Sequence, residues 1–93
     1  MKAVILEQNG GPENLRFVEN FPEPELQPNE VLVRIGATSL NRVDLHLRKG
    51  YPGLLLDFPH ILGGDIAGTV AKVGNNVRHF TEGTRVVSYP IVL

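Results

Sequence analysis

The sequence predicts a mainly β (α+β) fold with one short helix. Most of its apolar residues come in short runs that are bounded by the glycine, proline and asparagine clusters typical of turns. In the strongest run, residues 30–40, apolar side chains alternate with the period of two that a half-buried strand requires. Only residues 41–49 switch to the spacing of a helix.

The predicted strands are residues 2–6, 15–21, 30–40, 65–73 and 84–93. We expect the first two to pair as a meander, because a turn rich in glycine separates them. Gly36 interrupts the third strand, which indicates a β-bulge or a close approach of another backbone. Three prolines in residues 22–28 predict an exposed, extended connector. A disordered linker between domains is the alternative, but only about twenty residues precede it.

Residues 41–49 are predicted to form a helix of about two turns. Asn41 suits the N-cap, and Gly50 suits the position after the last turn. In such a helix Asn41 and Asp44 are neighbours, whereas Asp44 and His46 point in different directions and are not expected to pair.

Composition excludes several classes of function. A chain of 93 residues holds one domain at most. Its net charge of -1 and its lack of a Lys/Arg stripe argue against a nucleic-acid-binding protein. No apolar run approaches the roughly 20 residues of a membrane helix, so no membrane partner is expected. The absence of cysteine excludes disulfides and thiolate zinc ligands within these residues, and fits a cytoplasmic protein.

Few side chains stand out as candidates for chemistry. His46 lies next to a basic helical turn that favours a neutral imidazole, which can act as a proton shuttle; the alternative is an ordinary surface histidine. Gly63 and Gly64 let a backbone approach a ligand closely, or simply form a tight turn. His60 and His79 have no partners at metal-ligand spacing, and both are expected to be structural or exposed. No G-x-G-x-x-G dinucleotide-binding motif occurs.

Three blocks of sequence follow the proline-rich connector in a familiar order, NEVLVRIGATSLNRVDLHLRKG, PHILGGDIAGTVAKVG and VRHFTEGTRVV. This order resembles the start of the catalytic domain of medium-chain dehydrogenases/reductases, the family of zinc alcohol dehydrogenases and quinone oxidoreductases. The resemblance implies that residues 1–93 are the N-terminal segment of a GroES-like partial β-barrel. Because the sequence stays strand-like to Leu93, we expect a truncated barrel, with a Rossmann domain that binds NAD(P) beyond residue 93.

The resemblance also bears on metal binding. Asn41 stands where zinc-dependent members have a zinc-binding cysteine, and Gly64 stands where they have a histidine ligand. Val43 replaces their proton-handling Thr or Ser. These differences imply the zinc-independent branch, with no catalytic zinc; a structural zinc lobe, when present, would come after this segment.

The implied reaction is hydride transfer from NADPH (or NADH) to a small carbonyl or quinone substrate, such as an activated enone. Asn41 is expected to bind the substrate and stabilise its oxyanion, His46 to relay a proton, Tyr51 to line the pocket and Arg42 to contact the cofactor phosphates. The segment alone is expected to be inactive, and the full-length enzyme to be a homo-oligomer. The alternatives are a zinc alcohol dehydrogenase with atypical ligands and a non-catalytic GroES-like binding module.

Overall fold

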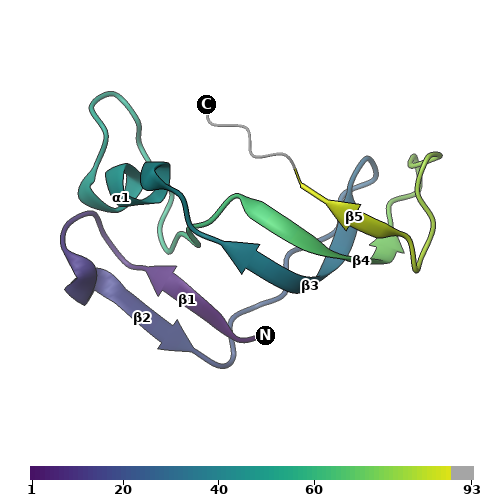
Figure 1. Ribbon diagram of the computed structural model, residues 1–93, viewed down its shortest axis with the longest axis horizontal. Helices are drawn as coiled ribbons and strands as arrows, with labels where there is room; N and C mark the ends of the chain where they lie inside the picture. The colour runs from purple at the N-terminus through teal and green to yellow at the C-terminus, as the bar shows by residue number, and fades with distance from the viewer. Residues whose placement is uncertain (89–93) are drawn as a thin grey trace. The chain divides into compact units, whose positions relative to one another are not determined.

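A computed structural model describes residues 1–88, and it confirms a mainly β chain with one short helix (Figure 1). The elements in order are β1 (Ala3–Leu6), the 3-10 helix η1 (Pro12–Asn14), β2 (Leu15–Val18), β3 (Val31–Ser39), α1 (Arg42–Lys49), β4 (Asp65–Val73) and β5 (Arg85–Val87). The described residues form two compact units. The first comprises residues 1–22 and 40–63, and the second comprises residues 23–39 and 64–88.

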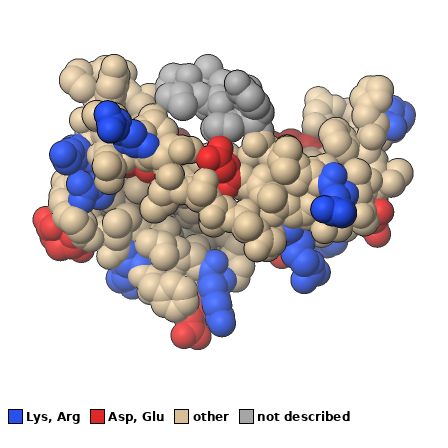
Figure 2. All heavy atoms as spheres, viewed as in Figure 1, with Lys and Arg blue, Asp and Glu red and all other residues tan. Residues whose placement is uncertain are grey.

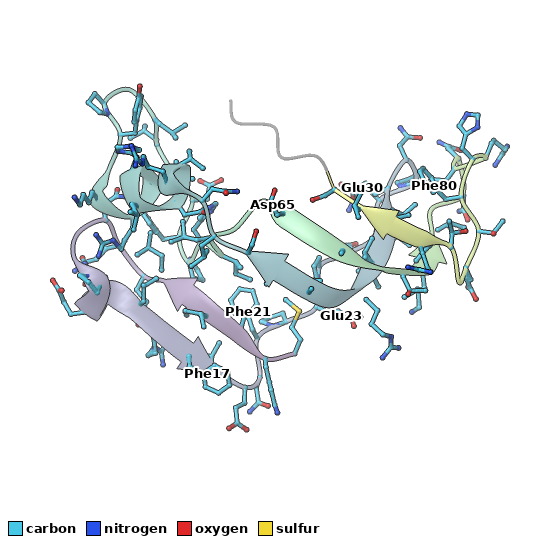
Figure 3. All side chains as sticks on the ribbon, viewed as in Figure 1. Phe17, Phe21, Glu23, Glu30, Asp65 and Phe80 are labelled. Atoms are coloured by element: carbon cyan, nitrogen blue, oxygen red, sulfur yellow. The ribbon has the colours of Figure 1, made fainter. Side chains whose placement is uncertain are left out.

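In the first unit, β1 and β2 pair antiparallel, as the predicted meander requires. The predicted strand over residues 15–21 is longer than β2, because the regular ladder ends at the pair Ala3–Val18. Beyond it the Phe21 N–H still donates to the Met1 carbonyl at 2.9 Å, and the Phe21 carbonyl accepts from the Met1 amino group at 2.7 Å. Ile5 and Leu6 are buried and form the core of this unit, whereas Phe17 projects from β2 and is 59% exposed (Figure 3).

The polypeptide that follows α1 is tied to β1. The Leu6 N–H donates to the His60 carbonyl at 2.7 Å, and the His60 N–H donates back to the Leu6 carbonyl at 3.0 Å. His60 is therefore held in place through its backbone. The pairing also brings the segment that ends at Gly63 next to the hairpin.

The second unit is a three-stranded antiparallel sheet in the order β3-β4-β5. Gly36 forms the predicted bulge, because Ile35 pairs with Gly68 and the next paired residue, Ala37, is opposite Ala67. The bulge brings two backbones close together at Gly68, where a Cβ atom would lie only 2.1 Å from the Arg34 carbonyl oxygen. Glycine is therefore required at position 68.

Exposure rises along β3 after Val33. The sequence predicts that Val31, Val33 and Ile35 share one face, yet Ile35 is 55% exposed while the two valines are half-buried. The first register shift leaves Ala71 of β4 unpaired and the second leaves Gly36 of β3 unpaired, so the alternation along β3 is interrupted only after Ile35.

The ends of the second unit differ from the prediction. β5 covers Arg85–Val87 of the predicted strand 84–93, and residues 89–93 of that prediction lie outside the described part of the chain. The proline-rich connector is irregular and mostly exposed, as predicted. Its end is not a free linker, because the Asn76 N–H donates to the Pro28 carbonyl at 2.8 Å. On the face that Figure 2 shows, acidic and basic side chains lie scattered among uncharged ones.

Candidate active site

All four residues that the sequence predicts for the active site lie in the first unit, on α1 or beside it. Asn41 immediately precedes α1, Arg42 is its first residue, His46 lies in its second half and Tyr51 follows it after one glycine. Each of the four is exposed. They are therefore accessible to a ligand, and their positions depend on how firmly this short helix is held.

The start of α1 is fixed by a capping box between Asn41 and Asp44. Asn41 has the extended backbone of an N-cap, with φ at -122°. Its backbone N–H donates to Asp44 Oδ2 at 2.8 Å, and its side chain accepts from the Asp44 N–H, which also lies 3.0 Å from the Asn41 carbonyl oxygen. The predicted N-cap is thus confirmed, and the backbone of Asn41 is held firmly by the buried side chain of Asp44.

Asp44 is a residue whose importance the sequence analysis missed. Its side chain is only 5% exposed, and its second oxygen, Oδ1, accepts a hydrogen bond from the Gly63 N–H at 2.9 Å. Gly63 has φ at +99°, a conformation that L residues with a Cβ rarely adopt. One carboxylate therefore fixes both the helix start and the first glycine of the pair Gly63–Gly64. The spacing of Asn41 and Asp44 was the available signal, since an acid three residues after an N-cap is typical of a capping box.

The end of α1 brings His46 and Tyr51 together. Their ring centroids are 6.4 Å apart and the rings are nearly perpendicular, at 80°, as in an edge-to-face contact. Gly50 ends the helix with φ at +107°, and its N–H donates to the His46 carbonyl at 2.9 Å, which confirms the predicted role of this glycine.

The other two predicted residues lie nearer the helix start. Arg42 is one turn before His46 on the same side of α1. Asn41 lies about 7.5 Å from His46 along the helix axis, because an α-helix rises about 1.5 Å per residue. The helix therefore presents an amide at one end and an imidazole–phenol pair at the other.

Among residues 1–88, the exposed Arg42 guanidinium makes no ion pair, so it is available to an anion. No group of three or more His, Cys, Asp or Glu side chains within the described range is arranged to hold a metal ion. The amide of Asn41 and the bare backbone of Gly64 supply neither thiolate nor imidazole. The helix in this described part is also too short and polar to span a membrane.

Comparison with known proteins identifies the family. The family described as "Alcohol dehydrogenase GroES-like domain" matches residues 27–92, which is more than half of the chain. The chain belongs to this family. It corresponds to the N-terminal part of the medium-chain dehydrogenases/reductases, as the sequence blocks around Asn41 and Gly64 predict. The open sheets described above are thus part of a GroES-like domain.

Individual relatives extend this result. The chain is 34% identical over 101 residues to the mitochondrial NAD(P)H oxidoreductase RTN4IP1 of Bos taurus, covering 92% of this chain and 26% of that protein. It is 42% identical over 81 residues to the sorbitol dehydrogenase of Ovis aries, covering 86% and 23%, respectively. Escherichia coli quinone oxidoreductase, solved in complex with NADPH, superposes with a TM-score of 0.85 at 34% identity, covering 100% of this chain and 28% of that one. The chain therefore spans about a quarter of the length of these relatives.

Proposed function

We propose that this GroES-like domain belongs to an NAD(P)H-dependent oxidoreductase that reduces quinones or activated enones without a catalytic zinc ion. A Rossmann domain after residue 93 would complete the enzyme. The observation that carries the proposal is the fixed N-cap. Position 41 is held by a buried carboxylate and carries an amide, which is a hydrogen-bond donor and not a zinc ligand. The relatives named as NAD(P)H and quinone oxidoreductases support this choice of reaction.

In this mechanism Asn41 takes the part that a metal ion plays in zinc enzymes. When a hydride adds to an activated enone or a quinone, negative charge accumulates on the substrate oxygen. A donor that is already in place stabilises this charge without having to reorganise. The Asn41 side-chain amide is such a donor, because the hydrogen bond from its backbone to Asp44 fixes the residue from which the amide projects.

The other predicted residues have separate tasks. A bound reduced nicotinamide would supply the hydride. His46 would deliver the proton that neutralises the reduced oxygen, with its ring oriented by the edge contact to Tyr51. Tyr51 is 58% exposed, which leaves part of its ring free to line a substrate pocket. Arg42 would bind a phosphate of the cofactor through its exposed guanidinium.

The proposal is tested by the kinetics of the intact protein that contains this chain. NADPH consumption is followed with a panel of quinones and enones, in the wild type and in the Asn41→Ala variant. Loss of one oxyanion donor typically costs about 10²- to 10³-fold in kcat, and we expect a decrease in this range. Asn20→Ala, an exposed asparagine far from α1 in the sequence, is the matched control and should leave kcat unchanged. Equal kinetics for Asn41→Ala and the control would remove Asn41 from the mechanism.

The similarity to sorbitol dehydrogenase favours a second candidate, a zinc-dependent alcohol dehydrogenase with atypical ligands. Zinc analysis after dialysis separates the two, because a catalytic zinc ion should remain bound at about one per subunit. A protein that neither binds nor oxidises NADPH would instead be a GroES-like binding module without catalytic activity.

A further inference from the structure

The loop between β1 and β2 holds the end of α1 that carries His46. Asn9 Nδ2 donates to the Leu47 carbonyl at 2.8 Å and lies 3.3 Å from the Arg48 carbonyl oxygen. The Gly10 N–H donates to the same Arg48 carbonyl at 2.8 Å. The last carbonyls of a helix have no donors within the helix, so these bonds satisfy groups that would otherwise require water. Asn9 and Leu47 are 38 residues apart in the sequence.

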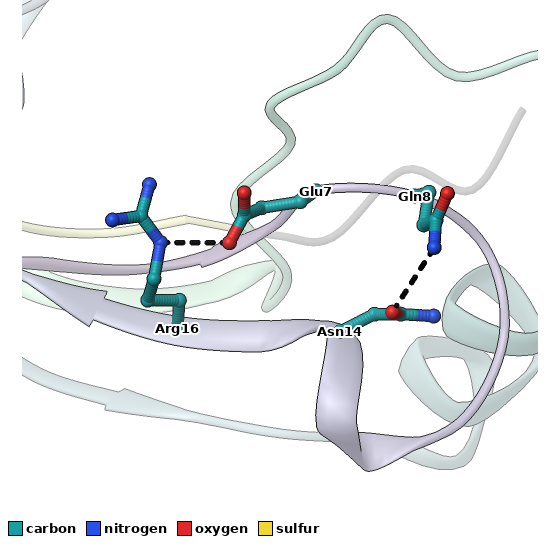
Figure 4. Close-up of polar contacts among 4 residues, drawn as sticks. All are labelled: Glu7, Gln8, Asn14 and Arg16. Atoms are coloured by element: carbon teal, nitrogen blue, oxygen red, sulfur yellow. Dashed lines mark hydrogen bonds and ion pairs between the residues drawn. The ribbon is translucent and has the colours of Figure 1, made fainter.

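The loop is itself held in one conformation. Asn14 Nδ2 donates to the Asn9 carbonyl at 3.1 Å, and the Glu7 N–H donates to the Asn14 carbonyl at 3.1 Å. Gln8 Nε2 also donates to Asn14 Oδ1 at 3.3 Å (Figure 4). The Asn9 side chain also packs on Gly50, where a Cβ atom would lie 3.5 Å from Asn9 Cγ. The hairpin loop thus forms a firm support beneath the end of α1.

This contact does more than end the helix. The turn at Gly50 already provides a local end, because its N–H bonds to the His46 carbonyl. The bonds from Asn9 come from a distant part of the chain, so they fix where the last turn lies relative to the hairpin. That turn carries His46 and leads directly into Tyr51, its ring partner.

We propose that Asn9 is a positioning residue that sets the geometry of the His46–Tyr51 pair. The inference deepens the proposed function and rests on it for its effect on catalysis. Removing the Asn9 amide lets the last turn of α1 move away from the hairpin and displaces the imidazole from the proton-delivery position. A small displacement of a catalytic group lowers kcat and leaves cofactor binding largely unchanged.

Kinetics of the intact protein test the catalytic part. We expect Asn9→Ala to lower kcat about tenfold, with little change in KM for NADPH. Asn20→Ala, at an exposed asparagine outside this loop, should leave kcat unchanged. The two changes Asn9→Ala and His46→Gln are then combined. If Asn9 acts through His46, adding Asn9→Ala to the His46→Gln variant causes no further loss; additive losses would overturn the proposal.

A spectroscopic measurement tests the positioning without relying on activity. In NMR spectra of the intact protein with ¹³C-labelled histidine, the His46 resonance is identified by its loss in His46→Gln. Because the Tyr51 ring lies 6.4 Å away, displacement of the imidazole changes its chemical shift. We expect a shift change in Asn9→Ala and none in Asn20→Ala; an unchanged His46 resonance in Asn9→Ala would contradict the proposal. If the wild type consumes no NADPH with any substrate, the proposed function fails while this test of Asn9 remains decisive.

Discussion

Replacing Asp44 with asparagine is expected to loosen the start of α1. The carboxylate accepts two backbone hydrogen bonds, from Asn41 at 2.8 Å and from Gly63 at 2.9 Å. An asparagine side chain has one oxygen, which accepts, and one NH₂ group, which donates. Either the Asn41 or the Gly63 backbone N–H must therefore face this NH₂ group and lose its hydrogen bond. A hydrogen bond to a charged group contributes about 1.5–3 kcal/mol, and Asp44 is only 5% exposed, so water cannot easily replace it. We expect the free energy of local opening to fall by about 2–3 kcal/mol.

Amide hydrogen exchange, measured by mass spectrometry on the intact protein, reports this opening directly. A decrease of about 2–3 kcal/mol accelerates exchange roughly 30- to 150-fold, since each 1.4 kcal/mol is about a factor of ten. The acceleration should be confined to peptides that cover residues 41–50 and 60–66. Asp57→Asn is the matched control, because Asp57 is exposed and its change should cost less than about 0.5 kcal/mol. Equal exchange in the two variants would refute the inferred role of the Asp44 carboxylate.

Further predictions concern the sheet and the cofactor. Gly68→Ala places a methyl group 2.1 Å from the Arg34 carbonyl oxygen, so the strands must separate, and unfolding by urea should show a loss of more than about 2 kcal/mol. Gly36→Ala, whose added methyl group would lie 3.4 Å from its nearest atom, should cost clearly less; equal losses would contradict the close approach at Gly68. Arg42→Ala should raise KM for NADPH about tenfold with kcat unchanged. The substitution removes a cofactor contact that is equally strong in the ground state and in the transition state. Lys49→Ala at the other end of α1 is its control, and equal KM values in the two variants would argue against phosphate binding by Arg42.

Local rules explain what the sequence could predict of the fold. The N-cap at Asn41, the helix end at Gly50 and the bulge at Gly36 each depend on the chemistry of one residue in its immediate surroundings. Strand lengths depend on the partner strand instead. The regular ladder of β1 and β2 ends at the pair Ala3–Val18, and Phe21 then bonds to the backbone of Met1; no pattern within residues 15–21 reveals this.

The predicted site likewise combines features that the sequence can predict with distant contacts that it cannot. The order of Asn41, Arg42, His46 and Tyr51 along one segment can be read from the sequence. What holds that segment cannot, because Asp44 binds Gly63 across 19 residues and Asn9 binds Leu47 across 38. Nothing in the sequence identifies the distant partners of these two short polar side chains, because only the fold brings them together.

The central claim is that this domain serves reduction by NAD(P)H without a catalytic zinc ion. Its most direct test is the rate of NADPH consumption by the intact protein with a quinone substrate, before and after prolonged dialysis against a zinc chelator. The proposal predicts an unchanged rate, with zinc far below one ion per subunit, and a rate that falls when Asn41 is replaced by alanine. Activity that disappears on chelation and returns when zinc is added would contradict it.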